Sequence, residues 1–245
     1  MFTFERVIKS AALIAALSAT SAFAVSNITI TKHNLSSGGS GTIKSATGDS
    51  NNEICVYCHT PHAANTAFSG APLWNKKSDT AAGAFTMYGR TAANQAGVTI
   101  AGTATAQQPN NPSMACLSCH DGASAINSMV NMPGSGGYNA GNQQYAAFGA
   151  TGAGTAFKMP AGLTQIGTDL SNDHPVSIPY NEGNASLKAV STTLSGWAGA
   201  GTIANLLRGG NVECSSCHDP HEGTNPTFLR TTNAGSALCL GCHGK

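Results

Sequence analysis

Charged residues are scarce in this chain of 245 residues. Lys and Arg number 12 and Asp and Glu 11, so charged residues make up 9% of the sequence, where about 25% is usual, and the formal net charge is +1. A nucleic-acid interface is disfavoured, because it needs clustered basic residues and Lys76-Lys77 is the only adjacent pair. Disorder of the usual kind, which combines low hydrophobicity with high net charge, is disfavoured as well.

Long hydrophobic runs are also lacking. Residues 1–24 have a short cationic start, an apolar stretch too short to cross a bilayer and an A-x-A cleavage site at residues 22–24, and are predicted to be a secretory signal peptide. No run of about 20 apolar residues follows, so no integral membrane segment is expected. We expect a secreted protein, extracellular or at the cell surface, with the periplasm as a transit or alternative compartment.

Cysteine and histidine are the informative residues, at eight each. The cysteines form four pairs with two residues between partners, and a His follows every pair. C-x-x-C alone fits zinc ribbons, redox dithiols or disulfides, but C-x-x-C-H is the attachment signal for c-type haem. The sequence therefore predicts four covalently attached haem c groups. The motifs are Cys55-x-x-Cys58-His59, Cys116-x-x-Cys119-His120, Cys214-x-x-Cys217-His218 and Cys239-x-x-Cys242-His243.

The spacing in each motif suits this chemistry. Two thiols three positions apart on a helical turn can each form a thioether with one vinyl group of a porphyrin, and the adjacent imidazole can reach the iron from one face. Haem attachment consumes both sulfurs of every motif, so no Cys is left for a disulfide, a metal cluster or a nucleophile. Zinc and disulfide frameworks are disfavoured, since a disulfide scaffold gives no reason for the four histidines.

Four histidines lie outside the motifs, which is one for each predicted haem that lacks a second axial ligand. This match predicts bis-histidine iron throughout, although methionine ligands are an alternative that core packing explains more simply. Six-coordinate iron of this kind passes electrons but has no open position for a substrate, so we expect electron transfer rather than catalysis. The four candidate distal ligands are His33, His62, His174 and His221.

Two of these histidines follow a motif by three residues, within residues 58–62 and 217–221. One short turn cannot supply ligands to both faces of the same haem, so the second His of each segment should ligate a neighbouring haem. The expected partners are His243 for His221 and His120 for His62, which leaves His33 and His174 for the haems of His59 and His218 in either order.

The C-x-x-C-H-x-P-H and C-L-x-C-H pattern resembles the doubled motif of multihaem cytochromes c, and residues 173–176 (Asp-His-Pro-Val) look like the distal-ligand segment that accompanies it. Four motifs, low charge and a Gly/Ser/Thr/Asn-rich chain are most similar to the secreted tetrahaem cytochromes that polymerise into extracellular filaments, the outer-membrane cytochrome E type of nanowire. The resemblance is specific at the motifs, whereas residues 65–115 and 122–211 match in composition and length only.

This resemblance implies a continuous haem chain that carries electrons to other cytochromes or an extracellular acceptor such as a metal oxide, with one distal His donated by the adjacent subunit. His33 precedes the Gly-rich residues 38–41, and the fourth haem is attached near the end of the sequence. A tethered arm can reach outward, and head-to-tail exchange of one element gives an open filament. We therefore expect a homopolymer that shares His33 between subunits, with ligation inside one chain as the alternative.

The expected fold is that of a multihaem cytochrome c, loop-rich with short helices wrapped around a haem chain and little regular sheet, in a single domain over residues 25–245. Short helical turns are expected at every motif. Residues 184–207 are the best candidate for further helix, 98–100 and 25–31 for short strands, and 134–154 for a linker or surface loop. Candidate partners for haem propionates are Arg90, Lys158, Arg208 and Arg230.

Two other functions fit less well. A monomeric periplasmic shuttle of the small tetrahaem kind is usually compact and Lys-rich for docking, unlike this chain. A multihaem reductase needs a haem with an open axial position, and the equal numbers of motif and distal histidines argue against one.

Overall fold

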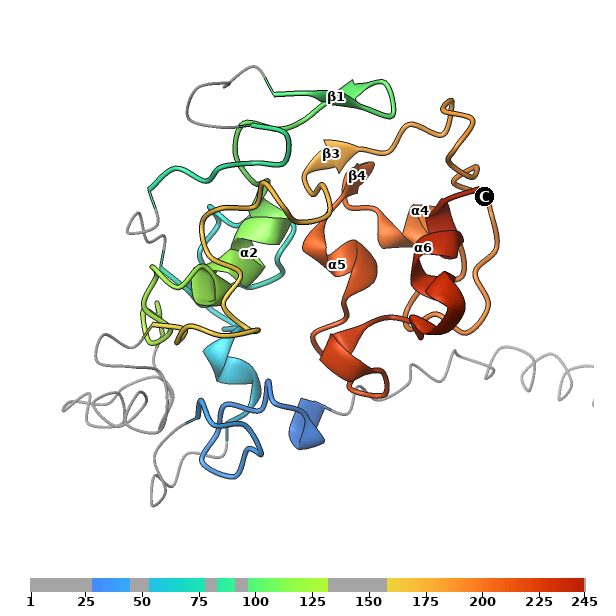
Figure 1. The fold of residues 1–245 in the computed structure, drawn as a ribbon. Coiled ribbons are helices and arrows are strands. Elements are labelled where there is room, and N and C mark those ends of the chain that lie inside the picture. Colours follow the sequence, from blue (N-terminus) through green and yellow to red (C-terminus); the bar gives the residue numbers. More distant parts are fainter. Residues whose placement is uncertain (1–27, 45–52, 78–82, 91–96, 132–157, 245) are drawn as a thin grey trace, which may run out of the picture.

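The computed structural model describes residues 28–44, 53–77, 83–90, 97–131 and 158–244 (Figure 1). The predicted signal peptide and the Gly-rich residues 134–154 lie outside these ranges. Loops connect short elements, which confirms the expectation of a loop-rich chain with little sheet. In chain order the elements are η1 (Ile28–Ile30), η2 (Cys55–Tyr57), β1 (Thr99–Ile100), β2 (Thr103–Ala104), α2 (Asn111–His120), β3 (Ile178–Pro179), α4 (Ile203–Leu206), β4 (Asn211–Val212), α5 (Cys214–Cys217), η4 (Pro226–Phe228), η5 (Ala234–Ser236) and α6 (Ala237–Cys242).

The helical turns expected at the motifs are confirmed. The four motifs begin in η2, α2, α5 and α6. The ten-residue α2 starts after the extended Asn110 and has Pro112 in its first turn, where proline's missing N–H costs nothing. In Figure 1, α5 lies between α2 and α6.

The helix expected over residues 184–207 is largely wrong, because only α4 forms there. The Asn205 side chain accepts the N–H of Thr202 at 3.0 Å and so caps the first turn. Leu207 is already extended, and Gly209 and Gly210 follow with positive φ. The helix therefore ends after four residues at Leu207, and the two glycines continue the chain into the turn before β4.

The strand prediction is confirmed at residues 99–100, where β1 pairs antiparallel with β2. It is wrong over the described part of residues 25–31, which forms the 3-10 turn η1. There the Thr31 hydroxyl donates to the Ile28 carbonyl at 2.9 Å, a local bond that competes with strand pairing. A second antiparallel pair, β3 with β4, was not predicted and leads the chain into α5.

Among the described residues, the hydrophobic core is divided into three small clusters, each packed against a motif. Tyr57, Ile126, Met129 and Met159 contact Cys58 and Cys119. A second cluster includes Leu117 of α2, and a third packs against Cys242 of α6. The buried Met87, Met129 and Met159 lie within these clusters, as expected of methionines that fill a core. In the described ranges, no helix is long and apolar enough to cross a membrane.

Candidate haem-binding sites

Each motif brings its two cysteines and its histidine onto one turn. The N–H of His59, His218 and His243 donates to the carbonyl of the first Cys in the same motif, at 2.8 to 3.0 Å. The second motif lies wholly within α2. All eight cysteines are described, and none of them forms a disulfide. Both thiols of each motif are therefore available on the turn that presents the imidazole.

Thiols of successive motifs lie close enough to influence one another's pKa. Burial, with Cys119 of the second motif nearby, raises the pKa of Cys58 to about 12. A hydrogen bond donated by Cys116 to the third motif's Cys214 raises the pKa of Cys116 well above its usual value. Burial, with Cys242 of the fourth motif nearby, raises the pKa of Cys217 to about 11. The first motif thus borders the second, the second the third, and the third the fourth.

Three motif histidines each face a histidine from outside their own motif. An iron about 2 Å from one nitrogen of each ring places the two ring centroids about 6 Å apart. The observed centroid separations match this requirement in three pairs, so the spacing of these rings is compatible with a metal held between them. The pairs are His33 with His120 at 6.1 Å, His59 with His221 at 6.1 Å, and His174 with His243 at 6.4 Å.

Backbone carbonyls anchor the other ring nitrogen of most of these histidines. The Nδ1 atoms of three motif histidines lie 2.7 to 2.8 Å from carbonyl oxygens, and those of two distal histidines 2.9 to 3.1 Å. A carbonyl accepts only the N–H form, so Nε2 is left free as the metal-binding nitrogen. The anchored pairs are His59 with Pro72, His120 with Thr164, His218 with Thr227, His174 with Pro175 and His33 with Pro220.

The observed pairs differ from those expected. His221 lies beside His59 rather than His243, and His33 rather than His62 faces His120. The reason is a long-range contact, since the Pro220 carbonyl holds the His33 ring over the third motif. Within the described part of the chain, His62 and His218 are the two histidines that are not placed in a pair.

His33 is enclosed by its own chain. Its ring stacks on Phe228 at a centroid distance of 4.2 Å and an interplanar angle of 12°. Burial lowers the pKa of His33, which disfavours its charged form. The arm that was expected to reach outward thus folds back over the third motif.

The first and third motifs share a local fold that the sequence analysis missed. Thr60 donates its N–H to Leu73 at 2.9 Å, and Asp219 donates its N–H to Phe228 at 2.8 Å. Leu73 and Phe228 both have positive φ, at 53° and 60°. The shared C-H-x-P-H segment was the available signal for this repeat.

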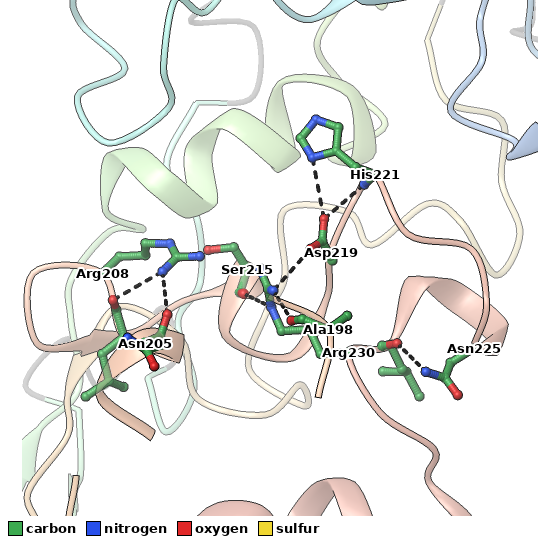
Figure 2. A network of polar contacts seen from close by, with 10 residues as sticks. Ala198, Asn205, Arg208, Ser215, Asp219, His221, Asn225 and Arg230 are labelled. Carbon is green, nitrogen blue, oxygen red and sulfur yellow. Dashed lines mark hydrogen bonds and ion pairs between the residues drawn. The ribbon is translucent and has the colours of Figure 1, made fainter. Parts of the chain in front are cut away.

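The cationic side chains expected to meet propionates divide into distinct environments. Arg90 is buried, and its Nη2 donates to the Thr105 carbonyl at 2.5 Å, but its Nε and Nη1 and the Thr105 hydroxyl are buried without a partner. Such orphaned donors need an acceptor, and a porphyrin propionate is one group that would suit a guanidinium. Arg208 donates to the Asn205 carbonyl and Arg230 pairs with Asp219 (Figure 2). Lys158 is half-buried.

Glu213, which no motif indicated, joins the second motif to the third. Its carboxylate is buried and accepts hydrogen bonds from Asn110 at 2.8 Å, Ser177 at 3.0 Å and Ser113. The same Ser113 hydroxyl accepts the N–H of Cys214 at 3.1 Å. Contacts from two distant segments, the start of α2 and Ser177, define this residue, so no local pattern could have revealed it.

A protein-family model described as the doubled CXXCH motif matches residues 207–245, which contain the third and fourth motifs. No curated protein matches the chain. The family match indicates covalently attached c-type haem and supports a multihaem c-type cytochrome with electron transfer.

Proposed function

We propose that this protein transfers electrons through four c-type haems, each attached to one C-x-x-C-H motif and ligated by two histidines. The observation that carries the proposal is the set of three imidazole pairs at 6.1 to 6.4 Å. Carbonyl anchors on Nδ1 support it, since they present Nε2 to the metal. When bound, haem supplies reversible one-electron chemistry.

The ligand sets follow from these pairs. We assign His33 with His120, His59 with His221, and His174 with His243. His62 and His218 are then left for the fourth haem. In this assignment the first and third motifs exchange distal ligands, because His62 follows the first motif and His221 follows the third. Their shared local fold supports such an exchange.

We propose a conduit and not an enzyme. Two imidazoles at each iron leave no coordination position for a substrate, and the proximity of thiols from successive motifs favours a continuous path. A multihaem reductase would need one haem without a distal histidine.

We further propose that the working form is a secreted homopolymer, extracellular or at the cell surface, that passes electrons to other cytochromes and to external acceptors. The low charge and the resemblance described above support it. The enclosed His33 favours ligation within one chain, so copies would associate through their surfaces. The monomeric shuttle is the alternative.

Expression with a c-type haem maturation system tests these proposals. Intact mass should report four haems, and the ferric and ferrous spectra should be wholly low-spin, without carbon monoxide binding. A haem that binds carbon monoxide would favour the reductase. Electron microscopy of haem-positive extracellular material should show filaments with a repeating subunit, whereas uniform particles of monomer size would favour the shuttle.

A further inference from the structure

The ring of His221 faces a carboxylate, whereas the anchored histidines face neutral carbonyl groups. Its Nδ1 lies 3.5 Å from Oδ1 of Asp219. The same oxygen accepts the backbone N–H of His221 at 3.1 Å, which holds Asp219 in place beside the ring (Figure 2). The Asp219 side chain is 19% exposed, so solvent screens its charge only partly.

The other oxygen of Asp219 is shared with a buried cation. Arg230 Nη1 donates to Oδ2 at 3.1 Å, and the Arg230 side chain is 7% exposed. Backbone carbonyls fix this guanidinium, since Nε donates to Ser215 at 2.8 Å and Nη1 to Ala198 at 2.6 Å. Figure 2 shows Asp219 between the imidazole and the guanidinium, so its charge is divided between them.

We propose that Asp219 and Arg230 set the reduction potential of the haem held by His59 and His221, with opposite signs. This inference rests on the proposed ligation. A carboxylate beside Nδ1–H makes an imidazole a stronger donor and stabilises the ferric state, which lowers the potential. Arg230 withdraws part of that negative charge and limits the effect. Both act through His221 and are therefore positioning residues.

The first motif provides an internal comparison. Thr60 occupies the place of Asp219 in the C-H-x-P-H segment, and its hydroxyl donates to the His62 carbonyl at 3.0 Å. The segment therefore folds with a neutral side chain at this position. Asp219→Thr introduces the residue that the first motif has at this position, and Asp219→Asn keeps the shape of the side chain. Either variant therefore removes the charge from a segment that should still fold.

The experiment is a spectroelectrochemical titration of the fully loaded protein, fitted to four one-electron components. Asp219→Asn and Asp219→Thr should each raise one component, by about 59 mV for a tenfold change in its redox equilibrium, a size typical of lost outer contacts to a metal ligand. Arg230→Gln should lower the same component. Asp219→Glu should restore a low potential.

The two proposals fail in different ways. Haem content and low-spin spectra are measured first, and a missing haem or an open coordination position in the unmodified protein would contradict the ligation itself. Four low-spin haems with unchanged potentials in Asp219→Asn would overturn the role of Asp219 alone. Shifts of the same sign in Asp219→Asn and Arg230→Gln would indicate a merely structural disturbance and would also overturn it. If Arg230→Gln does not fold, the test rests on the potentials of Asp219→Asn, Asp219→Thr and Asp219→Glu.

Discussion

His221 lies beside His59 with ring centroids 6.1 Å apart and an interplanar angle of 25°, although the two residues belong to the third and first motifs. Asp219 holds the backbone of His221, and the Pro72 carbonyl holds the ring of His59. Contacts within the protein thus help to position both imidazoles, which lowers the cost of forming a two-ligand site.

His221→Ala should convert one of four haems to a five-coordinate, high-spin form that binds carbon monoxide, because the ring opposite His59 is lost. His221→Met should keep that haem low-spin and raise its potential, since a thioether ligand favours ferrous iron. Optical spectra with carbon monoxide, combined with a redox titration, check both results. A haem complement that stays wholly low-spin in His221→Ala would contradict the assignment.

His33→Ala should leave one haem high-spin at every protein concentration, because His33 faces His120 within the same chain. The unmodified protein should stay wholly low-spin when diluted to monomers. Spectra recorded alongside light scattering separate this result from ligand sharing between subunits, in which dilution itself would open one haem.

Glu213→Ala should destabilise the protein by roughly 2 to 4 kcal/mol, because the hydroxyls of Ser113 and Ser177 lose a buried charged acceptor. Glu213→Gln should cost less, since its carbonyl can still accept one hydrogen bond. Denaturant unfolding of the loaded protein measures both. Equal stabilities of all three proteins would show that this carboxylate does not hold the second and third motifs together.

Gly241→Ala should destabilise the fourth motif by about 1 to 3 kcal/mol, the usual cost of overpacking. A Cβ at this position would lie 2.3 Å from Trp197, which packs on the turn between Cys239 and Cys242. Gly201→Ala is the matched control, because its Cβ would meet nothing nearer than 3.8 Å. Unfolding midpoints of the two variants should differ, and similar losses would argue against a specific clash.

Tyr180 should make stability depend on alkaline pH. Burial raises the pKa of Tyr180 from 10.0 to about 12, and its hydroxyl donates to the Lys188 carbonyl at 2.7 Å. A raised pKa means that the unfolded chain loses this proton first, so the contribution is complete below pH 10.0 and is lost as the pH rises toward about 12. The stability advantage over Tyr180→Phe should shrink across that interval. A constant difference would contradict the shift.

Local structure could be predicted from local spacing. Cys55, Cys58 and His59 share one helical turn, as predicted, because residues three and four positions apart meet on such a turn whatever the rest of the chain does. The helix expected over residues 184–207 failed because Thr202 and Asn205 cap a single short turn, which ends at the extended Leu207.

Only the tertiary structure decided which histidines meet. His33 reaches His120 because Pro220, far along the chain, accepts its Nδ1–H, and His221 turns toward the first motif instead of the fourth. The division of the Asp219 charge between His221 and Arg230 is of the same kind. The number of predicted haem-attachment motifs and their residues can thus be identified from short-range spacing in the sequence. The pairing of ligands and the charges around them depend on contacts between distant segments, which spacing alone does not encode.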